Sequence, residues 1–196
     1  MARYTDIRYL SVPDRSNEGI LDKIASVLRL PVGGRLGSYA GFQTEDPPAV
    51  FVVNTFESEQ ALAAFQASEA LDAVLRKLTG GEVVHRIVKF DEEVESRLRA
   101  PITEFVTCTL KEGNTMDQLR PLVLDLHDAL KGSAMFHGSS WAPVLNASNT
   151  YDGILGWDTV QAHWDAVSGG RPKEIIDRMK ELVNLFLVHA ALRRLV

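Results

Sequence analysis

The chain of 196 residues is long enough for one domain of ordinary size or for two of about a hundred residues each. Hydrophobic residues make up 45% and charged residues 24%, as in a typical folded soluble protein. The net charge of −5 disfavours a nucleic-acid partner or an anionic membrane surface, and no apolar run approaches the ~20 residues of a membrane helix. The single cysteine, Cys108, excludes an internal disulfide and a cysteine-based zinc cage. Because the first residues carry no apolar signal-peptide core, a cytoplasmic, reduced setting is expected.

The first half of the chain shows the hydrophobic patterns of four strands and two helices. The strands are predicted at 7–12, 35–43, 49–56 and 83–90, where β-favourable residues alternate or cluster. The helices are predicted at 17–29 and 57–78, the second broken near Ser68 and stopped by Gly80 and Gly81. The order βαββαβ is the ferredoxin-like arrangement.

The same order begins again after a charged segment. Strands are predicted at 104–110, 133–141, 151–157 and 185–192, and helices at 115–130 and 173–183. A further helix covers 158–167 and is expected to break over 168–172, which reads SGGRP. The predicted organisation is therefore a first repeat at 1–91, a linker at 92–102 with at most a turn or two of helix, and a second repeat at 103–196.

An internal repeat supports this division. The segment GWDTVQAHWDAV at 156–167 aligns without a gap on TFESEQALAAFQ at 55–66, so that Phe56 falls on Trp157. In both copies a hydroxyl residue follows two positions later and is well placed to cap the next helix. The copies differ where Leu62 lies opposite His163. A four-stranded sheet of this kind covers only one face with helices, so we expect the two sheets to pack together as an intramolecular α/β barrel.

The segment GWDTVQAHWDAV, between a strand and a helix, resembles the aromatic-then-His signature of the dimeric α/β-barrel superfamily. The closest similarity is to its antibiotic-biosynthesis-monooxygenase branch, in the fused tandem form common among fungal proteins. This resemblance implies a pocket for aromatic or polyketide-like substrates between sheet and helices, and several such proteins work without metal, flavin or haem. Because the first half has Phe56 and Leu62 at the motif positions, the second half is expected to be the active one.

Tryptophan and histidine are concentrated in the second repeat, which holds all three tryptophans and four of the five histidines. A pocket that stacks a flat substrate and moves protons needs these residue types. We predict His163 and His137 as proton-transfer groups, because the reference pKa of histidine suits general base chemistry near neutral pH. On strand alternation His137 should share a face with Met135, Ser139 and Trp141. The predicted substrate-binding residues are Trp157, Trp141, Phe136 and Trp164.

Other readings of the histidines stay open. His189 has a counterpart in His85 of the first repeat, which favours a structural role for both. No phosphate-binding loop, dinucleotide motif or His-Glu-x-x-His is present, and no metal or other cofactor is predicted. A histidine-only metal site at His137, His163 and His189 remains an alternative. A haem ligand is another, because some relatives in the wider superfamily bind haem.

Together with the concentration of His and Trp, the resemblance thus implies a cofactor-independent enzyme of secondary metabolism that acts on an aromatic or polyketide-derived small molecule. Oxygenation, cyclisation and decarboxylation would use the same base and the same apolar cavity, so they are not separated here. The alternative is a non-catalytic small-molecule-binding or stress-associated α/β-barrel protein. No nucleic-acid or membrane partner is expected, and further pairing of the chain as a homodimer is left open.

Overall fold

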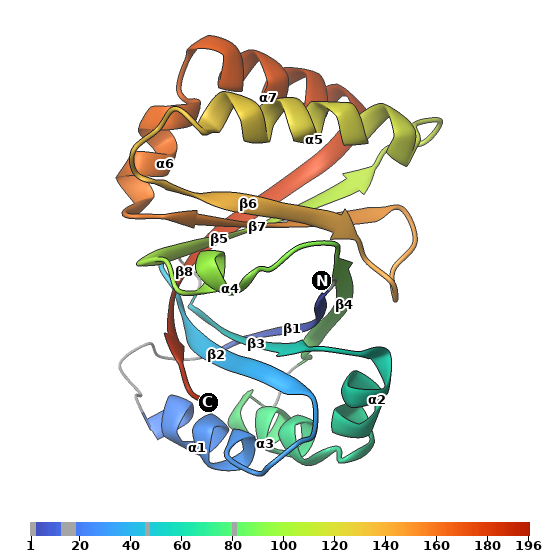
Figure 1. The fold of residues 1–196 in the computed structure, drawn as a ribbon, viewed down its shortest axis with the longest axis vertical. Coiled ribbons are helices and arrows are strands. Elements are labelled where there is room, and N and C mark those ends of the chain that lie inside the picture. The colour runs from blue at the N-terminus through green and yellow to red at the C-terminus, as the bar shows by residue number, and fades with distance from the viewer. Residues whose placement is uncertain (1–2, 13–18, 46–47, 80–81) are drawn as a thin grey trace. The chain divides into compact units, whose positions relative to one another are not determined.

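The computed structural model describes residues 3–12, 19–45, 48–79 and 82–196. By its contacts the chain divides into two compact units (Figure 1). The first comprises the residues up to 93 together with 190–196, and the second comprises 94–189. Residues 190–196, predicted within the second repeat, therefore belong by their contacts to the first unit. The reason is that the end of the last strand pairs with a strand of the first unit, Phe42 opposite Ala191.

The first unit is an antiparallel four-stranded sheet whose apolar helix faces pack on one side of it. Its strands follow the spatial order β4-β1-β3-β2. Its elements along the chain are β1 (Arg3–Ser11), α1 (Gly19–Leu28), β2 (Arg35–Gln43), β3 (Ala49–Phe56), α2 (Glu59–Ala67), α3 (Ala70–Thr79) and β4 (Val84–Phe90). The helix α1 illustrates the packing, because Ile20, Ile24 and Leu28 recur at helical spacing and are all buried against the strands.

The second unit repeats this arrangement, with the helices α5 and α7 lying over the same side of the sheet (Figure 1). Its strand order, β8-β5-β7-β6, is the counterpart of the first. Its elements are α4 (Glu95–Leu98), β5 (Ile102–Leu110), α5 (Met116–Leu130), β6 (Phe136–Pro143), β7 (Thr150–Trp157), α6 (Val160–Val167), α7 (Gly170–Leu182) and β8 (Val183–Arg194). The fold class, α+β with two ferredoxin-like βαββαβ repeats, is confirmed.

Two predicted helix boundaries can be compared with the structure. The break near Ser68 is confirmed, because Ser68 ends α2 and α3 begins two residues later. The break predicted over 168–172 is too long, because α7 already begins at Gly170. Pro172 falls in the first turn of that helix, where its missing N–H removes no helical hydrogen bond. The predicted helix stop at Gly80 and Gly81 and the predicted helix start at 17–18 lie outside the described residues.

The strand registers confirm the internal repeat at single-residue level. In the first unit Tyr4 of β1 lies opposite Phe56 of β3, and in the second Ile102 of β5 lies opposite Trp157 of β7. Both sheets also carry a register shift at the start of their second strand, before Gly37 and before Gly138. The matched registers define equivalent positions, so the residue two places after Tyr4 corresponds to the residue two places after Ile102. These two residues are Asp6 and Glu104.

The helix that follows the repeated motif starts in the same way in both units. The Ser58 hydroxyl accepts a hydrogen bond from the Ala61 backbone N–H, and the Thr159 hydroxyl accepts one from the Ala162 N–H. Each hydroxyl satisfies a donor that the first turn of the helix leaves without an intrahelical partner. The predicted capping role is therefore confirmed. None of the helices within the described residues is long and apolar enough to cross a membrane.

Candidate active site

The second unit contains a pocket of about 580 Å³ between its sheet and its helices. Most of its lining is apolar, with Leu126, Met179 and Leu185 as examples, and α7 also contributes the charged side chains of Lys173, Asp177 and Lys180. Glu104 of β5 and His163 of α6 also line it. The volume lies in the range of small-molecule sites, and an apolar hollow with a few convergent polar groups is the usual form of such a site.

One polar part of the pocket wall belongs to a buried group of one carboxylate and two imidazoles, of which Glu104 and His163 line the pocket. Glu104 and His163 are each 3% exposed, and His189 is 0% exposed. Nδ1 of His163 and Nε2 of His189 lie 2.9 Å apart and share a hydrogen bond. Nε2 of His163 lies 3.4 Å from Oε1 of Glu104. Ionisable groups this deeply buried are costly unless they pair, so their mutual contacts explain how the fold keeps them there.

Aromatic rings hold His163 in place. The ring centroids of Trp157 and Trp164 lie 5.2 and 4.5 Å from that of His163, and both rings are tilted against it. Trp157 is fully buried, and its indole Nε1–H donates to Oε2 of Glu104 at 2.7 Å. Trp164 is 45% exposed and lines the pocket. The imidazole thus lies between a buried indole, which also orients the carboxylate, and an accessible one.

The third tryptophan, Trp141, fits on the sheet because the residue opposite it is a glycine. Trp141 of β6 lines the pocket, and a Cβ built on Gly153 of β7 would lie 2.4 Å from its ring. The indole can therefore lie on the sheet only because position 153 has no side chain. In the first unit the register places Ala40 and Val52 as the corresponding neighbours. The large ring and the missing side chain occur together in the second unit only.

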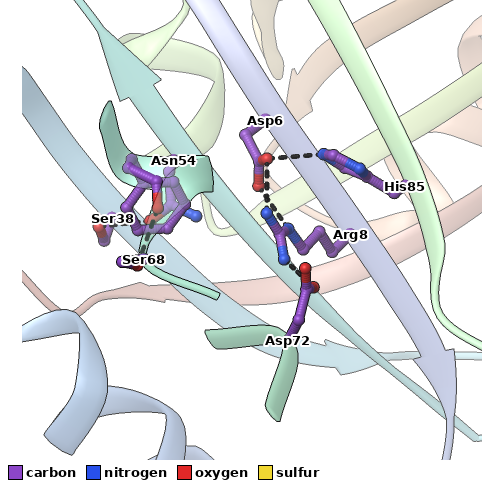
Figure 2. A network of polar contacts seen from close by, with 8 residues as sticks. Asp6, Arg8, Ser38, Asn54, Ser68, Asp72 and His85 are labelled. Carbon is purple, nitrogen blue, oxygen red and sulfur yellow. Dashed lines mark hydrogen bonds and ion pairs between the residues drawn. The ribbon is translucent and has the colours of Figure 1, made fainter. Parts of the chain in front are cut away.

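The first unit fills the corresponding place with charge (Figure 2). The register that equates Asp6 with Glu104 equates Arg8 with Val106, which lines the pocket. Arg8 is 2% exposed and makes a two-point contact with Asp6, from Nε to Oδ1 at 2.9 Å and from Nη2 to Oδ2 at 3.1 Å. It also pairs with Asp72, and its guanidinium lies 5.8 Å from the centre of the Phe65 ring.

Asp6 stays ionised inside this network. Burial by itself raises the pKa of its carboxyl, but the hydrogen bond with His85 and the charge of Arg8 outweigh burial, so the pKa lies below its ordinary value. Nε2 of His85 lies 2.7 Å from Oδ2 of Asp6. Figure 2 shows the Asp6 carboxylate contacted from two sides by His85 and Arg8, and shows the neighbouring hydrogen bond from Ser38 to Asn54. A buried acid on the first strand is thus common to both units, but its surroundings differ.

The structure brings four of the six predicted site residues to the pocket. His163, Trp157, Trp141 and Trp164 all line it. Phe136, predicted as a wall, instead packs against Trp157 at a centroid distance of 4.8 Å and supports that ring. Whether these residues bind or convert a ligand remains a prediction.

His137 is placed elsewhere, and the predicted face of its strand is wrong. Its side chain is 40% exposed and its Nε2 lies 2.7 Å from Oδ1 of Asp158, outside the pocket lining. The register shift between Phe136 and Gly138 interrupts the alternation, so Phe136 and not His137 lies on the side of Trp141. The histidine-only metal set that includes His137 is therefore not brought together.

Two residues of the buried group were missed or underrated from the sequence. Sequence patterns place Glu104 only at the start of a strand, although its equivalence with Asp6 signals that the repeat places an acid at this position. His85, the counterpart of His189, contacts the buried acid Asp6 of its own unit. His189 instead contacts the imidazole that lies beside Glu104. That imidazole is the pocket histidine His163.

Other reactive groups can be placed as well. Burial raises the pKa of the Cys108 thiol to about 12, and the Asp152 carboxylate adds to the effect, so Cys108 is a packing residue rather than a nucleophile. Among the described residues, Glu104, His163 and His189 form a group suited to a metal ion, with one ligand atom from each lying within 4.8 Å of the others.

No protein-family model and no curated protein sequence matches the chain. Several solved structures are similar to it. Two are crystal structures of proteins named putative monooxygenases. The one from Fusobacterium nucleatum has a TM-score of 0.73 at 11% identity over 98% of this chain and 94% of that one. The one from Lactobacillus acidophilus has a TM-score of 0.66 at 10% identity over 100% and 95%.

A third similar structure is that of an anthrone oxidase-like protein. Its TM-score is 0.71 at 14% identity, over 98% of this chain and 93% of that one. In all three cases nearly the whole of both chains is matched, so the resemblance to monooxygenase-like proteins is confirmed for the fold. At these identities the likeness extends to the fold alone.

Proposed function

We propose that this chain is a monooxygenase-type enzyme that works without a bound cofactor on an aromatic or polyketide-derived small molecule. The observation that carries the proposal is the position of His163 at the pocket wall, between two indoles and in contact with Glu104 and His189. A flat substrate would lie in the apolar pocket against Trp141 and Trp164. The monooxygenase names of the structural neighbours agree with this assignment.

In the proposed reaction His163 takes a phenolic or carbon-bound proton from the substrate. The Nδ1 side of its ring is held by His189 at 2.9 Å, and the Nε2 side faces the Glu104 carboxylate at 3.4 Å. A proton accepted at Nε2 lies next to that negative charge, which stabilises the imidazolium. The deprotonated, electron-rich substrate then reacts directly with dioxygen and supplies the electrons itself, so that one oxygen atom enters the oxidised product and the other leaves as water. Cyclisation or decarboxylation would start from the same proton transfer.

The rival function is that of a binding protein that holds a ligand without converting it. The contacts of His163 favour the enzyme, because a carboxylate beside Nε2 would stabilise the imidazolium that forms when the ring accepts a proton. His137 is not included in the proposed mechanism, because it lies outside the pocket.

Oxygen consumption tests the proposal. The purified chain is supplied with an anthrone, suggested by the anthrone oxidase-like neighbour, and with other hydroxylated aromatic compounds, always in the presence of a chelator. His163→Ala should lower kcat/KM by about 10²-fold or more, because it removes the base. The matched control His137→Ala removes an exposed imidazole and should leave kcat/KM unchanged.

Normal turnover in His163→Ala, or an equal loss in both variants, would contradict the assigned base. A ligand that binds the wild-type chain but is never converted would favour the rival function. Circular dichroism of each variant separates loss of catalysis from loss of the fold.

A further inference from the structure

We infer that Glu104, His163 and His189 form a binding site for one divalent transition-metal ion at the wall of the pocket. The inference rests on the side chains used by the proposed function, but it concerns binding and not turnover. One ligand atom from each of the three lies within 4.8 Å of the others, and all three residues are buried. This metal site differs from the histidine-only alternative of the sequence, because the Glu104 carboxylate takes the place of His137.

The spacing of the two imidazole nitrogens suits a metal ion. Metal–nitrogen bonds in proteins are about 2.0–2.1 Å long, so two nitrogens at right angles about one ion lie about 3 Å apart. Nδ1 of His163 and Nε2 of His189 lie 2.9 Å apart. In the metal-free chain this distance is a hydrogen bond, which requires a proton on one of the two nitrogens. A metal ion beside both nitrogens would take the place of that proton.

The third ligand, Glu104, lies on the Nε2 side of the His163 ring, so its carboxylate must turn toward Nδ1 to complete the site. The Trp157 indole N–H donates to Oε2 of Glu104 at 2.7 Å, while Oε1 faces His163. Hydrogen bonds of this kind from outside the ligand set fix ligand orientation and typically affect metal affinity 10- to 100-fold. Glu104 and His163 also line the pocket, so an ion held by them would present its remaining coordination positions to that space.

The donor set selects the class of metal. Two imidazoles and one carboxylate suit Zn²⁺, Fe²⁺, Co²⁺, Ni²⁺ and Cu²⁺, whereas Mg²⁺ and Ca²⁺ prefer sites made of oxygen ligands. Binding releases the shared proton, so the affinity should fall in acid. An imidazole that binds metal through Nδ1 keeps its own proton on Nε2 and cannot accept another. A bound ion should therefore inhibit the proposed reaction.

Calorimetric titration of the chelator-treated chain with Zn²⁺ tests the site, and the visible absorption of Co²⁺ reports its geometry. One ion per chain is expected. Glu104→Gln and His189→Gln should each weaken binding by at least about tenfold, and Trp157→Phe by about tenfold, because it leaves the carboxylate without its donor. The matched control is His137→Gln, which removes the exposed imidazole beside Asp158 and should change nothing.

The absence of a bound ion would overturn the inference, as would binding that is lost only in His137→Gln. Two ligand variants are used so that the failure of one to fold leaves the other as the test. The two proposals also fail separately. If the chain binds no metal but turns over in chelator, only the metal site is refuted. If it binds Zn²⁺ as expected but His163→Ala turns over normally, only the proposed base is refuted.

Discussion

A buried acid on the first strand of each unit is balanced in two different ways. In the first unit the Asp6 carboxylate is neutralised by the Arg8 guanidinium and by a hydrogen bond with His85. In the second the Glu104 carboxylate accepts from an indole N–H and faces an imidazole. A guanidinium is permanently charged, whereas an imidazole gains and loses a proton near neutral pH. The first arrangement suits a structural role and the second suits proton transfer.

The Asp6 network predicts a pH dependence of stability. Because the folded-state pKa of Asp6 lies below the ordinary value of 3.8, its contribution to stability is fully present above that value. The contribution is lost as the pH falls through the folded-state pKa. Urea unfolding should therefore show Asp6→Asn well below the wild type at pH 7, and the difference in free energy of unfolding should shrink below pH 4.

Asp72→Asn is a suitable control, because the Asp72 side chain pairs with Nη1 of the same guanidinium but is 35% exposed. Asp72→Asn should lower the free energy of unfolding by less than Asp6→Asn does, by about 1 kcal/mol or less. A difference between wild type and Asp6→Asn that stays constant down to pH 2.5 would show that the Asp6 charge does not stabilise the first unit.

At the level of elements, the neighbouring strands β6 and β7 shape the pocket through a pair of side chains. Trp141 lies where the first unit has Ala40, and Gly153 lies where it has Val52. A Cβ at position 153 would overlap the Trp141 ring, so the indole depends on the glycine beside it. At these two positions the sheet therefore carries an aromatic side chain and a glycine in the second unit, and two aliphatic side chains in the first.

A double-mutant cycle tests this exchange. Gly153→Val should destabilise the chain by about 1–3 kcal/mol, because its side chain overlaps the Trp141 ring. Adding Trp141→Ala should recover part of that loss, since the pair then matches Ala40 and Val52 of the first unit. Free energies of unfolding give the coupling between the two sites. Strictly additive effects would show that the ring does not depend on the glycine.

Hydrophobic periodicity was sufficient to predict the element order and the repeat, because alternation and helical spacing record which face of each element is buried. It failed at His137, since a register shift of one residue leaves no trace in a run such as MFHGSSW. The contact between Glu104 and His163 also required the fold, because it joins residues on a strand and a helix far apart in the chain. Among the sequence signals, only the internal repeat indicates an acid at position 104, because it equates Glu104 with Asp6.

On the scale of the whole molecule, one topology occurs twice and the chemistry is unequally divided. The three tryptophans and the histidine pair belong to the second unit, and the first unit carries the Arg8 network. The strand β8 takes part in both, because His189 contacts the pocket histidine and the next residues pair with β2. A single strand thus positions a site residue in one unit and completes the sheet of the other.

The most direct test of a ligand site in the second unit is the intrinsic tryptophan fluorescence of the chain. All three tryptophans line the pocket, so their emission reports on that space alone. Titration with the aromatic substrate of the turnover assay should give saturable 1:1 quenching in the wild type and in His137→Ala. Val106→Arg, which copies the Arg8 of the first unit, should abolish quenching while the far-UV circular dichroism is retained. Quenching that is absent in the wild type, or that persists unchanged in a folded Val106→Arg chain, would contradict the account.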